Sequence, residues 1–132
     1  MDTSVTLALC FKEEASAEID RCLRRVLAGD ALAPTLWALE TANVVNLAAR
    51  RGRIQPADRR HFLDLFQMLP VHLVATDQAS ALGRVADLAN EHGLTAYDAA
   101  YLAAAVTFGL PLATRDKALI RAAEGADVSL VL

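Results

Sequence analysis

The sequence has little cysteine, no long apolar run and no basic leader, and each shortage excludes a class of protein. Its two cysteines, Cys10 and Cys22, make no disulfide framework and lack metal-ligand spacing, so we expect free thiols in a reducing compartment. No basic segment precedes the short apolar run at the start, which argues against a secretory signal. Gly109 and Pro111 interrupt the longest apolar stretch, so we expect no membrane span.

An excess of one charge sign is also missing. The net charge of −3 argues at first against a nucleic-acid partner, but the charges are unevenly distributed. Eleven consecutive residues hold five arginines: Arg50, Arg51, Arg53, Arg59 and Arg60. Setting aside the four acidic residues discussed below leaves 12 acids against 13 bases, a surface that could hold a polyanion. Arginines at a helix end can equally complement the helix dipole or form an ordinary solvated surface.

The chain is long enough for one domain with its own core, which we place over residues 1–132. Hydrophobic periodicity and Gly or Pro breaks predict helices over residues 16–28, 35–51, 56–69, 77–92, 95–107 and 116–124. Strands are expected at 71–74, 111–114 and 128–132, and the segment TSVTLALCF could be a helix. This alternation predicts an α/β fold with a mainly parallel sheet, whose sites form at the carboxyl ends of its strands.

Three aspartates stand out at predicted helix starts, although each has an ordinary structural explanation. Thr95 and Asp98 have the spacing of a capping box. Asp116 follows a predicted strand and could be the N-cap of the next helix. Asp2 could cap a helix within TSVTLALCF, a role that Ser4 could also fill.

A fourth acid, Glu40, falls within the apolar stretch TLWALETANVVNLAAR. Helical projection places one face at Leu36, Leu39, Glu40, Asn43, Val44 and Leu47, which we expect to be the buried face. Glu40 could instead lie at the edge of that face and extend outward into water. Asn43, one turn further along, gives it a polar neighbour.

Together the four acids predict one site. In a parallel α/β domain their positions can converge at one end of the sheet. Clustered carboxylates repel one another, and ligands that are all oxygen suit a hard cation, Mg²⁺ or Mn²⁺. Such a site carries out phosphoryl chemistry with a metal-activated water.

Several short motifs occur along the chain in a fixed order. They are Asp2-Thr3-Ser4-Val5, Leu39-Glu40-x-x-Asn43, the block LTAYDAAYLA from Leu94, and Leu112-Ala113-Thr114-x-Asp116-Lys117-x-Leu119. In this order they resemble the PIN-domain family, and specifically its VapC type of toxin ribonuclease. Arg51-Gly52-Arg53-Ile54 and Glu91-His92-Gly93-Leu94 are also similar to stretches of that type. The resemblance covers nearly the whole chain.

The resemblance implies a PIN-like three-layer α/β/α fold with the acids at the carboxyl edge of the sheet. Asp2 and Asp98 would be the main Mg²⁺ ligands, and Glu40 and Asp116 would complete the pocket. The hydroxyls of Ser4 and Thr114 would support these ligands. Only Met1 precedes Asp2, where the family has several apolar residues, so we expect either that the true start lies upstream or that the first strand is truncated.

The activity implied is endonucleolytic cleavage of RNA that leaves a 3′-hydroxyl and a 5′-phosphate, with transfer RNA a common substrate of the type. Arg50, Arg51 and Arg53 are then RNA-binding candidates. The implied partners are a cognate VapB-like antitoxin of a type II toxin–antitoxin system and a second copy of the chain. The implied location is the cytoplasm of a bacterium or archaeon.

Two other functions stay open. The short N-terminus favours a catalytically impaired PIN-fold module that only binds its antitoxin. An aspartate-based phosphotransfer domain, with Asp2 as nucleophile or phospho-acceptor, is the second. Ser4 stands where the haloacid dehalogenase pattern has an aspartate, and Lys117 follows Asp116 instead of lying on a later strand, so this alternative is disfavoured.

Overall fold

The computed structural model describes residues 1–8, 11 and 16–131, and its elements alternate between helices and two short strands. In chain order they are α1 (Thr3–Ala8), α2 (Ala17–Leu27), β1 (Ala31–Pro34), α3 (Leu36–Arg50), α4 (Asp58–Met68), β2 (Val71–Val74), α5 (Gln78–Ser80), a π-helical turn (Ala81–Val85), α6 (Ala86–His92), α7 (Ala96–Phe108) and α8 (Lys117–Gly125). In the described part of the chain, no helix has the length and apolar character that crossing a membrane requires.

β1 and β2 form a parallel sheet of two strands, and further extended segments lie beside β1 and are joined by backbone hydrogen bonds. β1 pairs with β2 in parallel, with Ala31 opposite Val71. On the other side of β1, the nitrogen of Met1 donates to the Leu32 carbonyl at 2.9 Å. The Asp2 N–H donates to the Ala113 carbonyl at 3.0 Å. Leu112 and Leu130 then form an isolated parallel bridge, so five extended segments lie in the order β2, β1, 1–2, 112–113 and 129–131.

The strand at 71–74 was predicted correctly, but 111–114 and 128–132 do not form strands as predicted. They make only the bridge between Leu112 and Leu130, and residue 132 lies outside the described residues. Among the described residues, Met1 donates one backbone hydrogen bond to β1 and Asp2 donates one to Ala113, which is too few to form a regular ladder. Strand β1 was missed because ALAP lacks the β-branched and aromatic residues that favour strands.

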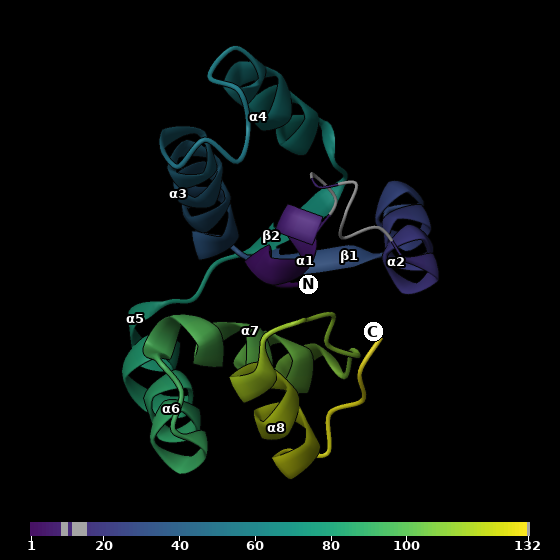
Figure 1. The fold of residues 1–132 in the computed structure, drawn as a ribbon. Helices are drawn as coiled ribbons and strands as arrows, with labels where there is room; N and C mark the ends of the chain where they lie inside the picture. The colour runs from purple at the N-terminus through teal and green to yellow at the C-terminus, as the bar shows by residue number, and fades with distance from the viewer. Residues whose placement is uncertain (9–10, 12–15, 132) are drawn as a thin grey trace.

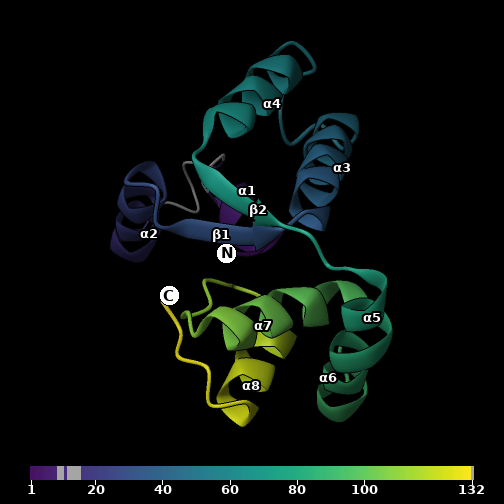
Figure 2. The same ribbon diagram turned by 180° about the vertical axis from the view of Figure 1, so that it is seen from behind.

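The helices cover the strands and extend away from them. Figure 1 shows α1 in front of β1 and β2, and Figure 2 shows it behind them, so α1 covers one face of the strands. α7 contacts β1, and α8 contacts α7. α3 and α4 contact each other and form a hairpin beyond the strands (Figure 1). The strands and α7 therefore bring the N-terminal and C-terminal parts of the chain together.

Helix α7 has little charge because most of its sides are buried in the core. Its buried residues fall on several sides of the helix: Ala99, Ala100, Tyr101, Leu102, Ala103 and Ala105. A helix that is apolar all round is expected to be buried. The main core cluster joins it to α1, α2 and α8 through Val5, Val26 and Leu119. This packing fixes the helix that carries Asp98.

The other predicted helices agree with the structure to within two residues, except at 77–92. There α5, the π-helical turn and α6 follow one another, with a kink at Gly83 (φ −103°, ψ −105°). The helix considered for TSVTLALCF is present as α1, and Leu9 and Cys10 lie outside the described residues. Cys22 is a buried free thiol, as expected.

Candidate active site

Asp2 is a buried carboxylate held by three hydrogen-bond donors. Its Oδ1 accepts from the Ser4 hydroxyl at 2.7 Å and from the Val5 N–H at 3.2 Å. Its Oδ2 accepts from the Thr114 hydroxyl at 2.6 Å. Asp2 is 4 % exposed, and this burial raises its pKa above the usual range, while the three hydrogen bonds oppose the rise. The bond from Val5 also makes Asp2 the cap of α1, so capping and site roles coincide here.

Thr114 and Ser4 tie Asp2 to the segment that leads into α8. The Thr114 hydroxyl, which donates to Asp2, also accepts from the Asp116 N–H at 3.0 Å. The Ser4 hydroxyl accepts from the Arg115 N–H at 2.8 Å. Asp116 Oδ1 caps α8 by accepting from the N–H groups of Ala118 and Leu119, at 2.8 and 2.9 Å. Both hydroxyls proposed from the sequence therefore lie against Asp2.

Glu40 is joined to the start of the chain through two hydroxyls. Its Oε2 accepts from the Thr3 hydroxyl at 3.0 Å and from the Tyr101 phenol in a short hydrogen bond. The Thr3 and Tyr101 oxygens are themselves 3.2 Å apart. Burial first, and then the Glu40 carboxylate, raise the pKa of Tyr101, so the phenol keeps its proton and acts as a donor. Thr3 is the residue after Asp2, so the backbone places the Glu40 contacts next to those of Asp2, although the hydrogen bonds between described residues do not join the two sets.

Thr95 caps α7 as predicted, but the Asp98 carboxylate binds the Thr95 hydroxyl and not the Thr95 backbone N–H that would complete a capping box. The Asp98 N–H donates to the Thr95 hydroxyl at 3.1 Å, and the Asp98 Oδ2 accepts from that hydroxyl at 2.7 Å. The side chain is half-buried. Residues three apart share a helix face, so Asp98 lies one turn from Tyr101, the partner of Glu40. Its hydrogen bonds to described residues nevertheless stay within α7 and Thr95 and do not reach the other three acids.

The buried face of α3 differs from the predicted one. The buried residues are Trp37, Thr41, Val45 and Ala48, whereas Leu39 is 77 % exposed and Asn43 is exposed. The stretch has apolar residues on every side, so its periodicity does not define one face. The Trp37 indole N–H donates to the Thr6 hydroxyl at 2.8 Å, which fixes the orientation. Asn43 makes no hydrogen bond to a described residue, so the polar partners of Glu40 are Thr3 and Tyr101.

The four acids supply oxygen ligands without forming an assembled metal centre. Among the described residues, no group of three or more His, Cys, Asp or Glu side chains is arranged to hold a metal ion. Each carboxylate is engaged by hydroxyl or backbone N–H donors instead. The chemistry of the donor set, carboxylates with hydroxyls beside them, fits a hard cation such as Mg²⁺ or Mn²⁺.

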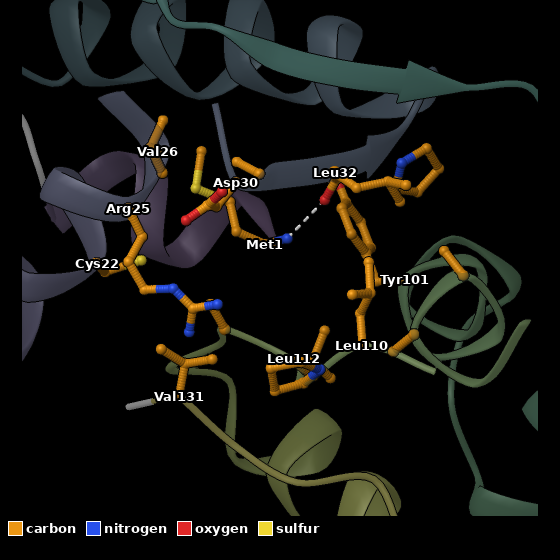
Figure 3. Close-up of a pocket in the computed structure, with 16 residues that line it drawn as sticks. Met1, Cys22, Arg25, Val26, Asp30, Leu32, Tyr101, Leu110, Leu112 and Val131 are labelled. Carbon is orange, nitrogen blue, oxygen red and sulfur yellow. Dashed lines mark hydrogen bonds between the residues drawn. The ribbon is translucent and has the colours of Figure 1, made fainter. Parts of the chain in front are cut away.

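A cavity of about 70 Å³ is lined by Tyr101 and by Met1, the residue before Asp2. Figure 3 shows Met1, Arg25, Tyr101, Leu112 and Val131 around it. None of the four acids lines this cavity. The cavity therefore adjoins the candidate active site at Tyr101 without including its carboxylates.

Thr3 and Tyr101 are site residues that the sequence did not single out. Both lie in recognised motifs, Thr3 beside Asp2 and Tyr101 one turn after Asp98. Helical spacing from Asp98 was the available signal for Tyr101. Its contact with Glu40 joins residues 61 apart in the chain, and no local pattern contains that pairing.

Comparison with known proteins identifies the family of the chain. Residues 1–125 match the PIN domain family. The chain is 34 % identical over 123 residues to ribonuclease VapC3 of Pyrobaculum aerophilum, covering 90 % of this chain and 89 % of that protein. A crystal structure of PAE2754 from Pyrobaculum aerophilum is similar with a TM-score of 0.70 and 27 % identity, over 92 % of this chain and 82 % of that one. The chain belongs to the PIN-domain family and is of its VapC type.

Proposed function

We propose that the protein is a divalent-cation-dependent endoribonuclease, the toxin of a type II toxin–antitoxin pair. The observation that carries the proposal is that hydroxyl side chains hold the carboxylates of the buried Asp2 and of Glu40, and one of them also binds the Asp116 N–H, in a chain of the VapC type. The related protein from Pyrobaculum aerophilum is named a ribonuclease, which supports RNA as the substrate.

The residues of this chain position the carboxylates before RNA arrives. Ser4, Thr114 and the Val5 N–H orient both oxygens of Asp2. Thr3 and Tyr101 donate hydrogen bonds to one oxygen of Glu40 and so fix its position. Such fixed positions lower the reorganisation that a reaction requires.

The residues that would hold Mg²⁺ or Mn²⁺ are Asp2 and Asp98, with Glu40 and Asp116 completing the pocket. When bound, the cation would lower the pKa of a water molecule and stabilise the charge on the leaving oxygen. Addition of that water across the phosphodiester would give a 5′-phosphate and a 3′-hydroxyl.

The proposed protein partners are a VapB-like antitoxin and a second copy of the chain. Several large apolar side chains are exposed and would be covered by such partners: Leu39, Met68, Leu82 and Phe108. Sedimentation of the protein alone and with its antitoxin tests both partners. A monomer that fails to bind the antitoxin would contradict this part of the proposal.

A second candidate is a PIN-fold module that binds its antitoxin without cleaving RNA. The absence of a three-residue metal group among the described residues favours it. A titration of RNA cleavage against Mg²⁺, with Asp98→Asn as control, separates the two. Mg²⁺-dependent cleavage lost in Asp98→Asn supports the nuclease, whereas intact antitoxin binding without any cleavage supports the binding module.

A further inference from the structure

The arginines of the α3–α4 hairpin differ in what they contact. Arg60 is paired with Asp64 within α4. The guanidinium of Arg53 lies over the Phe11 ring, 3.9 Å from its centroid. Arg50 and Arg59 face a shared pocket instead. Arg50 and Arg59 therefore differ from Arg53 and Arg60, because they line a space in which a ligand could bind.

The pocket has about 410 Å³ of space and a positive lining. Its walls are Asn46, Ala49 and Arg50 from α3, Pro56 from the connecting turn and Arg59 from α4. No acidic side chain lines it. Two guanidinium groups around one space repel each other unless an anion lies between them. The lining therefore suits an anion.

Asn46 holds one of these arginines in place. The Asn46 Oδ1 accepts from Arg59 Nη1 at 2.7 Å. A guanidinium has five N–H donors in a planar fork, so this bond fixes its orientation and leaves donors for an anion. Planar forks of this kind match the oxygens of a phosphate. Arg59 is half-buried, which further restricts its movement.

The pocket also lies along the same helix as Glu40. Arg50 follows Glu40 by ten residues, about 15 Å along the axis at the rise of an α-helix. Glu40, Asn43, Leu47 and Arg50 are spaced three or four residues apart, so they follow one side of α3. The end of α3 that carries Arg50 points away from the strands (Figure 1). Of the pocket residues on α3, Arg50 projects nearest to this side, whereas Asn46 and Ala49 project about 120° and 180° from Glu40, so an RNA strand bound at Glu40 would pass Arg50 to reach the pocket.

We propose that Asn46, Arg50 and Arg59 form a binding site for a backbone phosphate of the RNA, away from the bond that is cleaved. This rests on the proposed ribonuclease function. Of the arginines expected from the sequence to bind RNA, this site includes Arg50 but not Arg53. Arg59 also belongs to the site, and Asn46 is the residue that positions Arg59. Because the site contacts phosphate, it contributes affinity without base preference.

The test is RNA binding by Arg50→Ala in an Asp98→Asn background, which prevents cleavage. Arg50 makes no side-chain hydrogen bond to a described residue, so this variant leaves the Asn46–Arg59 contact intact. Fluorescence anisotropy with a labelled single-stranded RNA of about twenty nucleotides gives Kd at several salt concentrations. Arg24→Ala is the matched control, because Arg24 is also exposed in the last turn of a helix and lies on α2.

We expect Arg50→Ala to weaken binding about tenfold and to reduce the slope of log K against log salt by about 0.7, the value for one lost phosphate contact on a single strand. Arg50→Lys should restore part of the slope, and a dinucleotide too short to reach the pocket should bind both proteins equally. If Arg50→Ala behaves as Arg24→Ala while wild-type protein cleaves RNA, the phosphate site is wrong and the nuclease stands. If wild-type protein neither binds nor cleaves RNA, both proposals fail.

Discussion

Thr114 donates a hydrogen bond of 2.6 Å to the carboxylate of Asp2, across 112 residues of sequence. Both residues are almost fully buried. The same hydroxyl accepts from the Asp116 N–H, so one side chain connects the first and last acids of the candidate site. The start of α1 and the start of α8 are thereby held together at this point.

Thr114→Val should lower stability, because it keeps the shape of the side chain and removes the donor to a buried charge. A hydrogen bond to a charged group contributes about 1.5–3 kcal/mol, so we expect the free energy of unfolding to fall by about that amount. Thr76→Val is the control, since Thr76 is exposed and its side chain makes no hydrogen bond to a described residue. Equal urea midpoints for the two variants would contradict this role of Thr114.

When a chelator removes metal ions, the contribution of Asp2 to the free energy of unfolding should decrease as the pH rises. Its folded pKa is raised above the model-peptide value of 3.8, so between the two pKa values the folded protein binds more protons than the unfolded chain. The contribution of Asp2 is therefore fully present below pH 3.8 and is lost as pH rises through the raised pKa. The measurement is the difference in unfolding free energy between wild type and Asp2→Asn across this range. A difference that does not change with pH would count against the raised pKa.

Tyr101→Phe should reduce the rate of RNA cleavage in protein that remains folded. The substitution removes one of two hydroxyls that hold Glu40, and loss of such a supporting group typically costs about 10–100-fold in metal affinity or activity. Tyr97→Phe is a matched control, because the Tyr97 side chain is 68 % exposed. Equal cleavage rates for the two variants would show that Tyr101 has no positioning role.

Mg²⁺ should raise the Tm of the wild-type protein but not that of Asp98→Asn. A ligand that binds only the folded state stabilises it by about 2.7 kcal/mol at a hundred times its Kd. Asp87→Asn, on α6, removes an exposed carboxylate outside the network and should keep the shift. This readout does not depend on activity. A shift that survives in Asp98→Asn would exclude Asp98 as a ligand.

Features set by neighbouring residues were predicted from the sequence. Thr95 with Asp98, and Asp116 with the two N–H groups that it caps, depend only on residues within one turn. Asp2 likewise caps the helix that begins beside it.

Features that depend on distant residues were predicted less well. The orientation of α3 is fixed by the contact of Trp37 with Thr6, 31 residues away, and the predicted face was wrong. The Tyr101–Glu40 contact was missed for the same reason. Segments 111–114 and 128–132 have the composition of strands, but strand pairing also needs neighbours that supply a ladder.

The most direct test of the account is single-turnover cleavage of RNA by Asp2→Asn at saturating Mg²⁺, with Asp87→Asn measured beside it. Asp2 lies at the centre of the hydroxyl network and is proposed to hold the cation, whose charge stabilisation contributes several kcal/mol. Each 1.36 kcal/mol is a factor of ten in rate, so we predict that folded Asp2→Asn loses at least about a hundredfold while Asp87→Asn keeps the wild-type rate. Cleavage by Asp2→Asn at the wild-type rate would contradict the account.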